Sequence, residues 1–193
     1  MIKRESLLSL EAYARERNAF RARVMEHKKR RTVHLGANLT LLFEDELTIR
    51  YQVQEMLRIE RIFEEEGIQG ELDAYNPLIP DGSNWKATML IEYPRAEQRS
   101  AMLEKLIGIE DRVWIQIEGW PRGYAVADED LDRQKSRKTA SVHFLRFDLD
   151  RHMVLDLRKG AAVSAGVDHP HYTTAAVRLD PAVIESLMKD LVV

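Results

Sequence analysis

The sequence predicts an α+β fold, in which a mainly antiparallel sheet packs against a long pair of N-terminal helices. The strand candidates alternate apolar and polar residues, which is typical of sheets that bury one face. The longest helical patterns lie near the N-terminus and do not alternate regularly with strands, as they would in a parallel α/β fold. Hydrophobic residues make up 45% of the 193 residues, which is enough for a core, and we expect a single domain over 1–193.

The helices are predicted from apolar residues that recur at helical spacing. The first covers residues 6–30, and Asp45 can begin a second helix of about five turns that Gly67 can end. Three shorter helices are predicted at 94–108, 151–159 and 180–191. The last of them begins with Asp180–Pro181, a pair suited to the first turn of a helix.

The strands are predicted from alternation, most clearly from Trp85 to Tyr93 and from Arg112 to Glu118. A segment at 32–44 also has strand character and contains a turn signal at 36–38. Further strands are predicted at 124–127, 141–149, 161–167 and 175–179. Residues 70–84 are predicted to form a loop and 128–138 a hydrophilic connector.

Charged residues fall on the apolar stripes of both long helices. A rotation of about 100° per residue places Arg17 and Arg21 in the middle of the first stripe, and Glu60, flanked by Glu64, in the second. A lone buried charge is costly, whereas a hydrogen-bonded opposite pair is tolerated. We therefore predict that one arginine meets one of these carboxylates between the helices, unless the long side chains reach solvent at the helix edges. Such a pair would either fix the helix register or form the floor of a polar binding site.

The densest cluster of candidate metal ligands is Asp168, His169 and His171. A carboxylate with imidazoles is a usable ligand set for Zn, Mn or Fe, so a divalent metal is the candidate cofactor. A further ligand, such as His143 or Glu118, would have to come from elsewhere in the chain. The alternative is that these residues serve the structure of a loop or strand end.

The segment 76–85 is long, rich in turn-forming residues and stiffened by two prolines. Such a segment favours an ordered surface, on which Asp81, Ser83, Asn84 and Trp85 are candidates to present a ligand or partner site. The alternative is a packed connector between two elements.

Composition excludes several classes of function. The chain has no cysteine, so disulfides, thiol catalysis and iron–sulfur ligation by this chain are ruled out. No apolar run approaches the ~18 residues of a membrane span, and the N-terminus becomes charged too early for a signal peptide. We therefore expect a cytoplasmic protein without a membrane partner. The standard glycine-rich nucleotide-binding motifs are absent.

Charge is unevenly distributed along the chain. The formal net charge is −3, but residues 1–31 contain 10 basic and 4 acidic residues and so carry +6, which leaves −9 on 32–193. The two parts can attract each other within one molecule, or the run Lys28–Arg31 can contact an anionic partner. Nucleic acid is not favoured as that partner, because the sequence shows neither a broad basic face nor exposed aromatic residues beside the run.

Five strings of sequence resemble the bacterial domain-of-unknown-function 3501 family, and the likeness covers nearly the whole chain. They are RTVHLG (31–36), LTLLFE (39–44), YQVQEMLRIE (51–60), LDAYNPLIP (72–80) and SAGVDHP (164–170). The family has no established activity, and its members are typically encoded near a rubrerythrin-like protein and an iron–sulfur oxidoreductase. The resemblance thus implies an accessory or binding protein of an iron-dependent redox or peroxide-stress system, with one of those proteins as partner.

Nucleic-acid binding through residues 28–31 stays a third hypothesis, behind two functions that the sequence favours. One is a non-enzymatic accessory protein, and the other is a metal-binding protein or metal-dependent enzyme that uses Asp168, His169 and His171. The resemblance supplies no catalytic residues, and a homo-oligomer is compatible with either function.

Overall fold

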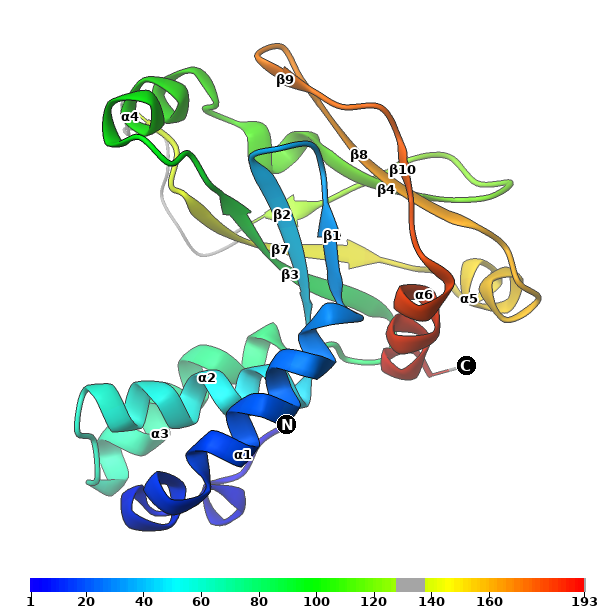
Figure 1. Ribbon diagram of the computed structural model, residues 1–193. Helices are drawn as coiled ribbons and strands as arrows, with labels where there is room; N and C mark the ends of the chain where they lie inside the picture. The colour runs from blue at the N-terminus through cyan, green and yellow to red at the C-terminus, as the bar shows by residue number, and fades with distance from the viewer. Residues whose placement is uncertain (128–137, 193) are drawn as a thin grey trace.

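The computed structural model describes residues 1–127 and 138–192, and over these residues it contains six α-helices and two antiparallel sheets (Figure 1). The predicted α+β class is confirmed. Helices α1, α2 and α3 lie together at one end of the molecule, and both sheets lie at the other end (Figure 1). The longest helices are therefore packed with one another and meet the sheets at one side only.

The helical end is formed by α1 (Leu10–Lys29), α2 (Glu46–Ile59) and α3 (Glu65–Tyr75), flanked by the short 3₁₀ turns Arg4–Ser6 and Asn76–Leu78. Asp45 begins α2 as predicted, through a capping box in which its carboxylate accepts the Thr48 amide and its own amide donates to the Thr48 hydroxyl.

The prediction that one helix extends from Asp45 to Gly67 is wrong. Helix α2 ends at Ile59, and a separate helix, α3, begins at Glu65. Gly67 lies inside α3 and does not end a helix. A Cβ at Gly67 would come within 2.7 Å of Ile62 Cγ2, so the absence of a side chain lets the connection fold back tightly. Part of the predicted 70–84 loop is consequently helical.

The first sheet has the order β1 (Thr32–His34), β2 (Leu39–Glu44), β3 (Asn84–Ile91), β7 (Val142–Asp148) and β6 (Val126–Ala127). The expected turn inside 32–44 divides that segment into β1 and β2, which pair as a hairpin. Leu41, Met89 and Ala87 are among the residues on its buried face, and Leu41 lies opposite Met89 across β2 and β3.

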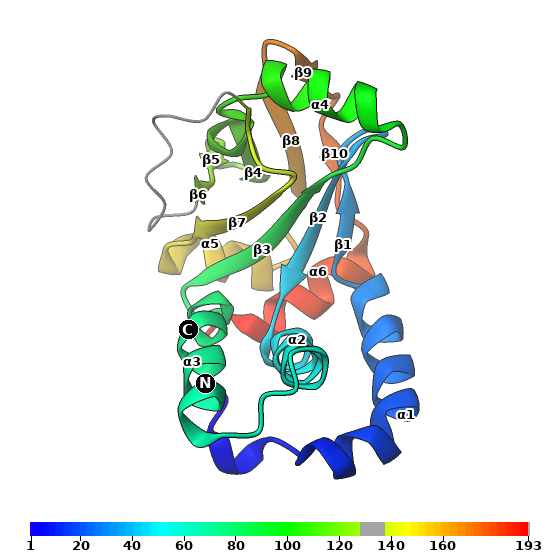
Figure 2. The ribbon, with the colours of Figure 1, turned by 90° about the vertical axis from the view of Figure 1, so that its left-hand side faces the viewer.

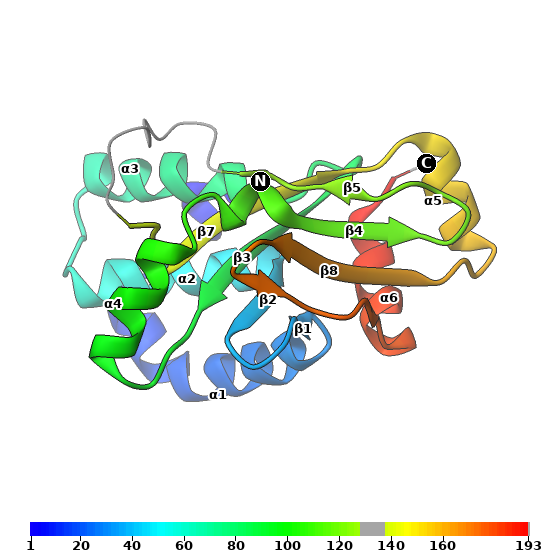
Figure 3. The ribbon, with the colours of Figure 1, turned by 90° about the horizontal axis from the view of Figure 1, so that it is seen from above.

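The second sheet has the order β10 (Val177–Arg178), β8 (Val163–His169), β4 (Val113–Ile117) and β5 (Gly123–Tyr124), with β9 (Tyr172–Thr173) paired to β8. It lies over the first sheet (Figure 3). The main hydrophobic core packs between the two sheets and receives side chains from the remaining helices. These are α4 (Ala96–Lys105), α5 (Arg151–Arg158) and α6 (Pro181–Leu187), with 3₁₀ turns at Ile109–Arg112 and Met188–Asp190.

A second, smaller core joins α2 to α3 and to the N-terminal residues. Its buried members are Ile2, Leu7, Ile49, Val53, Leu57, Ile68 and Leu72. Each such side chain contributes roughly 1.5–3 kcal/mol when it is fully buried. The helical end is therefore held by its own apolar contacts, and its position relative to the sheets depends on the junction between the two parts.

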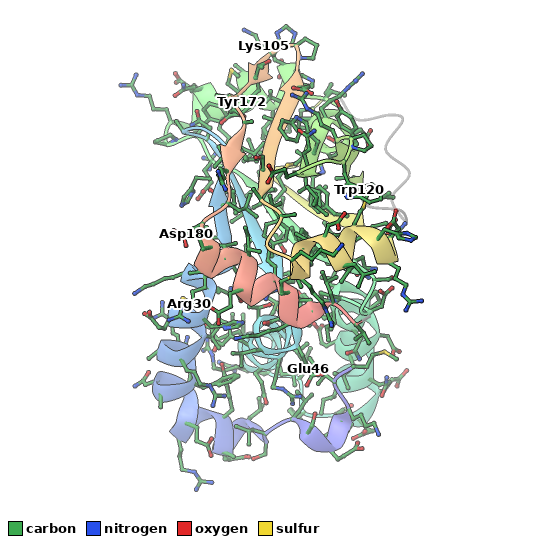
Figure 4. All side chains as sticks on the ribbon, turned by 90° about the vertical axis from the view of Figure 1, so that its right-hand side faces the viewer. Arg30, Glu46, Lys105, Trp120, Tyr172 and Asp180 are labelled. Carbon is green, nitrogen blue, oxygen red and sulfur yellow. The ribbon has the colours of Figure 1, made fainter. Side chains whose placement is uncertain are left out.

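Arg31 forms that junction, although the sequence placed it at the end of a basic run. Its side chain is 1% exposed, and its guanidinium donates to the carbonyl oxygens of Phe43 (2.8 Å) and Glu44 (2.9 Å). It also donates to the Ser186 hydroxyl (3.2 Å) and to the Asp190 carboxylate. Arg31 therefore ties the end of α1 to the corner between β2 and α2, and to the C-terminal helix. Figure 4 labels its neighbour Arg30, at the end of α1, and Asp180, at the start of α6.

Two carboxylates share the positive charge at this junction. Asp45 lies 3.6 Å from Arg31 Nη1 and 2.5 Å from His27 Nε2. Burial alone would raise the pKa of Asp45, but Arg31, the Thr48 amide and His27 hold it below its usual value. Burial raises the pKa of Asp190 to about 6, despite the opposing effect of Arg31.

Candidate functional site

A cavity of about 650 Å³ opens between α2–α3 and the face of the first sheet that is turned away from the second sheet. We call it the groove; Figure 2 shows how α2 and α3 lie relative to β3 and β7, which border it. It is bounded by the end of β2, by β3, β6 and β7, and by α2, α3 and the turn at Asn76–Leu78. A volume of this size, located between two parts of a fold, is typical of small-molecule sites.

The walls of the groove are largely apolar. The helical end supplies Met56, Tyr75 and Leu78, and the sheet supplies Val126 and Phe144. The two sheet residues are 38% and 40% exposed, at positions where a solvated sheet face usually carries polar side chains. The groove therefore offers a contact surface for an apolar molecule.

Glu44, the last residue of β2, places a buried carboxylate in the groove. The residue is only 7% exposed, and its Oε1 accepts a hydrogen bond of 2.6 Å from the Thr88 hydroxyl. Among residues 1–127 and 138–192, Thr88 is the one side chain bonded to this carboxylate, and no Lys, Arg or His side chain forms a salt bridge with it. Since a buried charge needs several partners, the second oxygen depends on water or on a ligand.

Lys86 lies directly opposite Glu44 in the antiparallel register but does not neutralise it. Its ammonium group donates to the carbonyl oxygen of Pro77 and so holds the turn after α3 against the sheet. Two more carboxylates, Glu71 and Asp73, line the groove from α3, and Arg146 lines it from β7. Among the described residues that line the groove, carboxylates therefore outnumber basic groups.

An arginine–carboxylate bridge joins α1 to α2, but its acidic partner is not the predicted one. Arg17 donates to both oxygens of Glu55, from Nε at 2.7 Å and from Nη2 at 2.9 Å. The Tyr13 hydroxyl (2.8 Å) and Arg58 (3.1 Å) bind the same carboxylate. The Arg17 hydrogen bonds are the largest cause that lowers the pKa of Glu55 to about 2.

The prediction that Arg17 or Arg21 pairs with Glu60 or Glu64 is therefore wrong about the acidic partner, which is Glu55. Arg21, Glu60 and Glu64 are exposed, and Glu60 follows the last residue of α2. Because α2 is buried on most of its circumference, a single apolar stripe does not describe its packing. Arg17, Arg21 and Glu60 do not line the groove, so the bridge serves the packing of helices and not a polar pocket.

The predicted surface at 76–85 is not formed as a unit. Asn84 and Trp85 are buried, and the Trp85 indole donates to the carbonyl oxygen of Leu187 at 3.0 Å. Asp81 and Ser83 are exposed, but the Asp81 carboxylate accepts the Ser83 amide (2.9 Å) and the Asn84 side-chain amide (2.9 Å). Residues 81–85 form a packed connector because Trp85 begins the buried face of β3, whereas Pro77 and Leu78 of the same segment line the groove.

The three candidate metal ligands are adjacent in the chain but engaged with different groups. The Asp168 carboxylate accepts from Arg122 Nη1 (2.6 Å) and from the Tyr124 hydroxyl (3.0 Å). His169 is buried, and its two ring nitrogens contact the Ile107 carbonyl oxygen (3.1 Å) and the His171 amide (3.2 Å). The carbonyl can only accept and the amide can only donate, so Nε2 of His169 carries the proton.

A metal at His169 would have to displace one of these two hydrogen bonds. The further ligands considered from the sequence do not approach it: buried His143 contacts Thr139, and Glu118 accepts the Ala162 amide. Within the described parts of the chain, no group of three or more His, Asp or Glu side chains could hold a metal ion. Nor is any helix in those parts long and apolar enough to cross a membrane.

Sequence reasoning missed the groove and Glu44, although one signal was present. In the strand around β7, Val142 and Phe144 alternate with Leu145 and Phe147, so apolar residues occupy both faces. A strand that is apolar on both faces indicates a second covered or ligand-contacting surface. The partners of that surface come from α2 and α3, which no local pattern could place there.

A solved structure shares this fold almost completely. It is described as the crystal structure of a novel protein of unknown function from Burkholderia pseudomallei K96243. The two chains are 57% identical, the TM-score is 0.95, and the match covers 98% of each chain. No functionally curated protein is significantly similar to the chain. A family model described as "Protein of unknown function (DUF3501)" matches residues 1–191, and the chain belongs to that family.

Proposed function

We propose that this protein is an accessory binding protein that holds a small organic molecule in the groove. The observation that carries the proposal is a cavity of about 650 Å³ with apolar walls and a buried, incompletely paired carboxylate, Glu44. Small-molecule sites combine these features: apolar walls supply contact area, and a few polar groups fix the orientation of the ligand.

The family resemblance extends this proposal to a cellular setting. It supports a cytoplasmic role beside an iron-dependent redox or peroxide-stress system, with an iron–sulfur oxidoreductase or a rubrerythrin-like protein as the partner. Affinity purification of the protein from its native cells, at low and moderate salt, tests this setting. Enrichment of neither partner under any condition would contradict it and leave ligand binding in the groove unaffected.

Ligand binding in the groove is tested by NMR titration of the ¹⁵N-labelled protein with 2-phenylethanol, a small neutral probe with an apolar body. We expect saturable shifts of amides around Met56, Tyr75 and Phe144. The variant Ala74→Trp fills the groove from an exposed position of α3 and should abolish these shifts. Ala19→Trp, at an exposed position of α1 outside the groove, is the matched control and should bind as the wild type does. Unchanged binding by Ala74→Trp, or no groove shifts with any probe, would contradict the proposal.

A further inference from the structure

We infer that the ligand of the groove carries a cationic nitrogen, an ammonium or a guanidinium, that binds the Glu44 carboxylate while its apolar body lies along the walls. This inference rests on the proposed function and specifies the class of ligand. It assigns to Glu44 the part of the site that determines specificity.

The first argument is the burial of Glu44 together with its shortage of partners. Glu44 is the last residue of β2 and is 7% exposed as a whole residue, and Thr88 is bonded to one of its side-chain oxygens. A carboxylate has about four acceptor positions, and a single hydroxyl leaves most of them open. Taking an ionised carboxylate out of water is expensive unless opposite charge or several donors compensate. A ligand that brings a cation supplies both.

The second argument is that the cationic residue directly opposite Glu44 in the sheet is bonded elsewhere. Lys86 is the direct cross-strand neighbour of Glu44 and would be the obvious counter-ion. Its ammonium group instead donates to the Pro77 carbonyl oxygen, which fixes the turn that forms one wall of the groove. Lys86 therefore stabilises one wall of the groove, and the negative charge of Glu44 is left to pair with another group.

The third argument concerns the other charges of the groove. Glu71 and Asp73 add negative charge from α3, and Arg146 directs its Nε to Asp148 at 3.0 Å. An anionic ligand such as a phosphate or a carboxylate would be repelled by the carboxylates of Glu44, Glu71 and Asp73, whereas a cation would be attracted by them. The apolar walls also disfavour a uniformly polar cation. The combination selects an alkyl or aromatic amine, or a guanidine with an apolar body.

The test compares three probes of similar shape: 2-phenylethylamine, 2-phenylethanol and 3-phenylpropionate. Each is titrated by NMR into the wild type, and groove amides report the dissociation constant. Hydrogen bonds to charged groups contribute about 1.5–3 kcal/mol, which corresponds to roughly 10- to 100-fold in affinity. We therefore expect the amine to bind at least about 10-fold more tightly than the alcohol, and the carboxylate most weakly.

Three variants test whether Glu44 causes the preference for the amine over the alcohol. Glu44→Gln keeps the size of the side chain and an acceptor for Thr88, and it should reduce amine affinity to that of the alcohol. Thr88→Val removes the hydroxyl but keeps the charge, so the preference for the amine should persist. Glu60→Gln, an exposed change outside the groove, should leave all three affinities unchanged.

The outcomes separate the inference from the proposed function. Groove binding of the alcohol and the amine with equal affinity, or an amine preference that survives Glu44→Gln, overturns the inference and leaves the binding function standing. Failure of all three probes to shift groove amides overturns both. If Glu44→Gln does not fold, the ranking of the three probes in the wild type decides the inference by itself.

Discussion

Replacing Glu55 with Gln should lower the free energy of unfolding by about 2 kcal/mol at neutral pH. Glu55 accepts hydrogen bonds from Arg17, Arg58 and Tyr13, and these contacts bring its pKa from 4.5 to about 2. One pKa unit corresponds to about 1.4 kcal/mol, so the carboxylate contributes at most about 3.5 kcal/mol. Arg17 is 31% exposed, and solvent screening reduces the expected loss to about 2 kcal/mol.

The lowered pKa of Glu55 also predicts how the loss of stability in Glu55→Gln depends on pH. A carboxyl group whose pKa is lower in the folded than in the unfolded state stabilises the protein above the unfolded value, and this contribution is lost as the pH falls towards the folded value. The difference between wild type and Glu55→Gln should therefore be complete at neutral pH, decrease below 4.5 and vanish near 2. Urea denaturation at a series of pH values, followed by tryptophan fluorescence, measures it.

Glu60→Gln is the matched control, because it makes the same chemical change at an exposed residue beyond the end of α2. It should change the free energy of unfolding by less than about 0.5 kcal/mol at every pH. If Glu55→Gln were as stable as Glu60→Gln at neutral pH, the bridge would not hold α1 to α2. A difference that stayed constant down to about pH 3 would show that lost packing, and not charge, explains the effect.

Three further predictions concern the sheets and the junction. Asp190 has its pKa raised from 3.8 to about 6, so its titration makes the protein less stable as the pH rises between these values, and Asp190→Asn should remove that part of the slope in urea denaturation. Gly166→Ala would place a Cβ 2.3 Å from Trp114 Cζ2, and thermal unfolding should show a loss of about 1–3 kcal/mol. The Tyr172 hydroxyl donates to the Leu35 carbonyl oxygen at 2.7 Å, so Tyr172→Phe should cost about 1 kcal/mol by urea denaturation.

The strands and most helix starts could be predicted because their signals are local. The alternation from Trp85 to Tyr93 marks the buried face of β3, and Asp45 and Asp180 cap helices at the expected positions. The break between α2 and α3 was missed because Gly67 was interpreted by its helix-ending tendency. Its actual role depends on contact with Ile62 across the tight connection, which only the packed structure reveals.

The polar contacts were harder to predict because they depend on distant segments. The helical projection identified Arg17 correctly because only one side of α1 is buried. It selected the wrong carboxylate on α2 because that helix is buried on most sides. Arg31 looked like one charge in a surface run, yet its partners include Ser186 and Asp190, more than 150 residues away. Glu44 could not be identified as a site residue for the same reason, since Met56 and Tyr75 line the groove with it only after α2 and α3 have packed.

The groove and the Arg31 junction meet at one corner of the chain, between β2 and α2. The carbonyl oxygen of Glu44 accepts from Arg31, while its side chain faces the groove, and the next residue, Asp45, caps α2. The contacts of Arg31 with Ser186 and Asp190 anchor this corner to the C-terminal helix. The buried guanidinium therefore fixes the backbone that carries the carboxylate and also the start of the helix that supplies Met56. The geometry of the groove therefore depends on Arg31, which does not line it. The corner that Arg31 holds carries both the Glu44 carboxylate and the start of α2, which forms one wall of the groove.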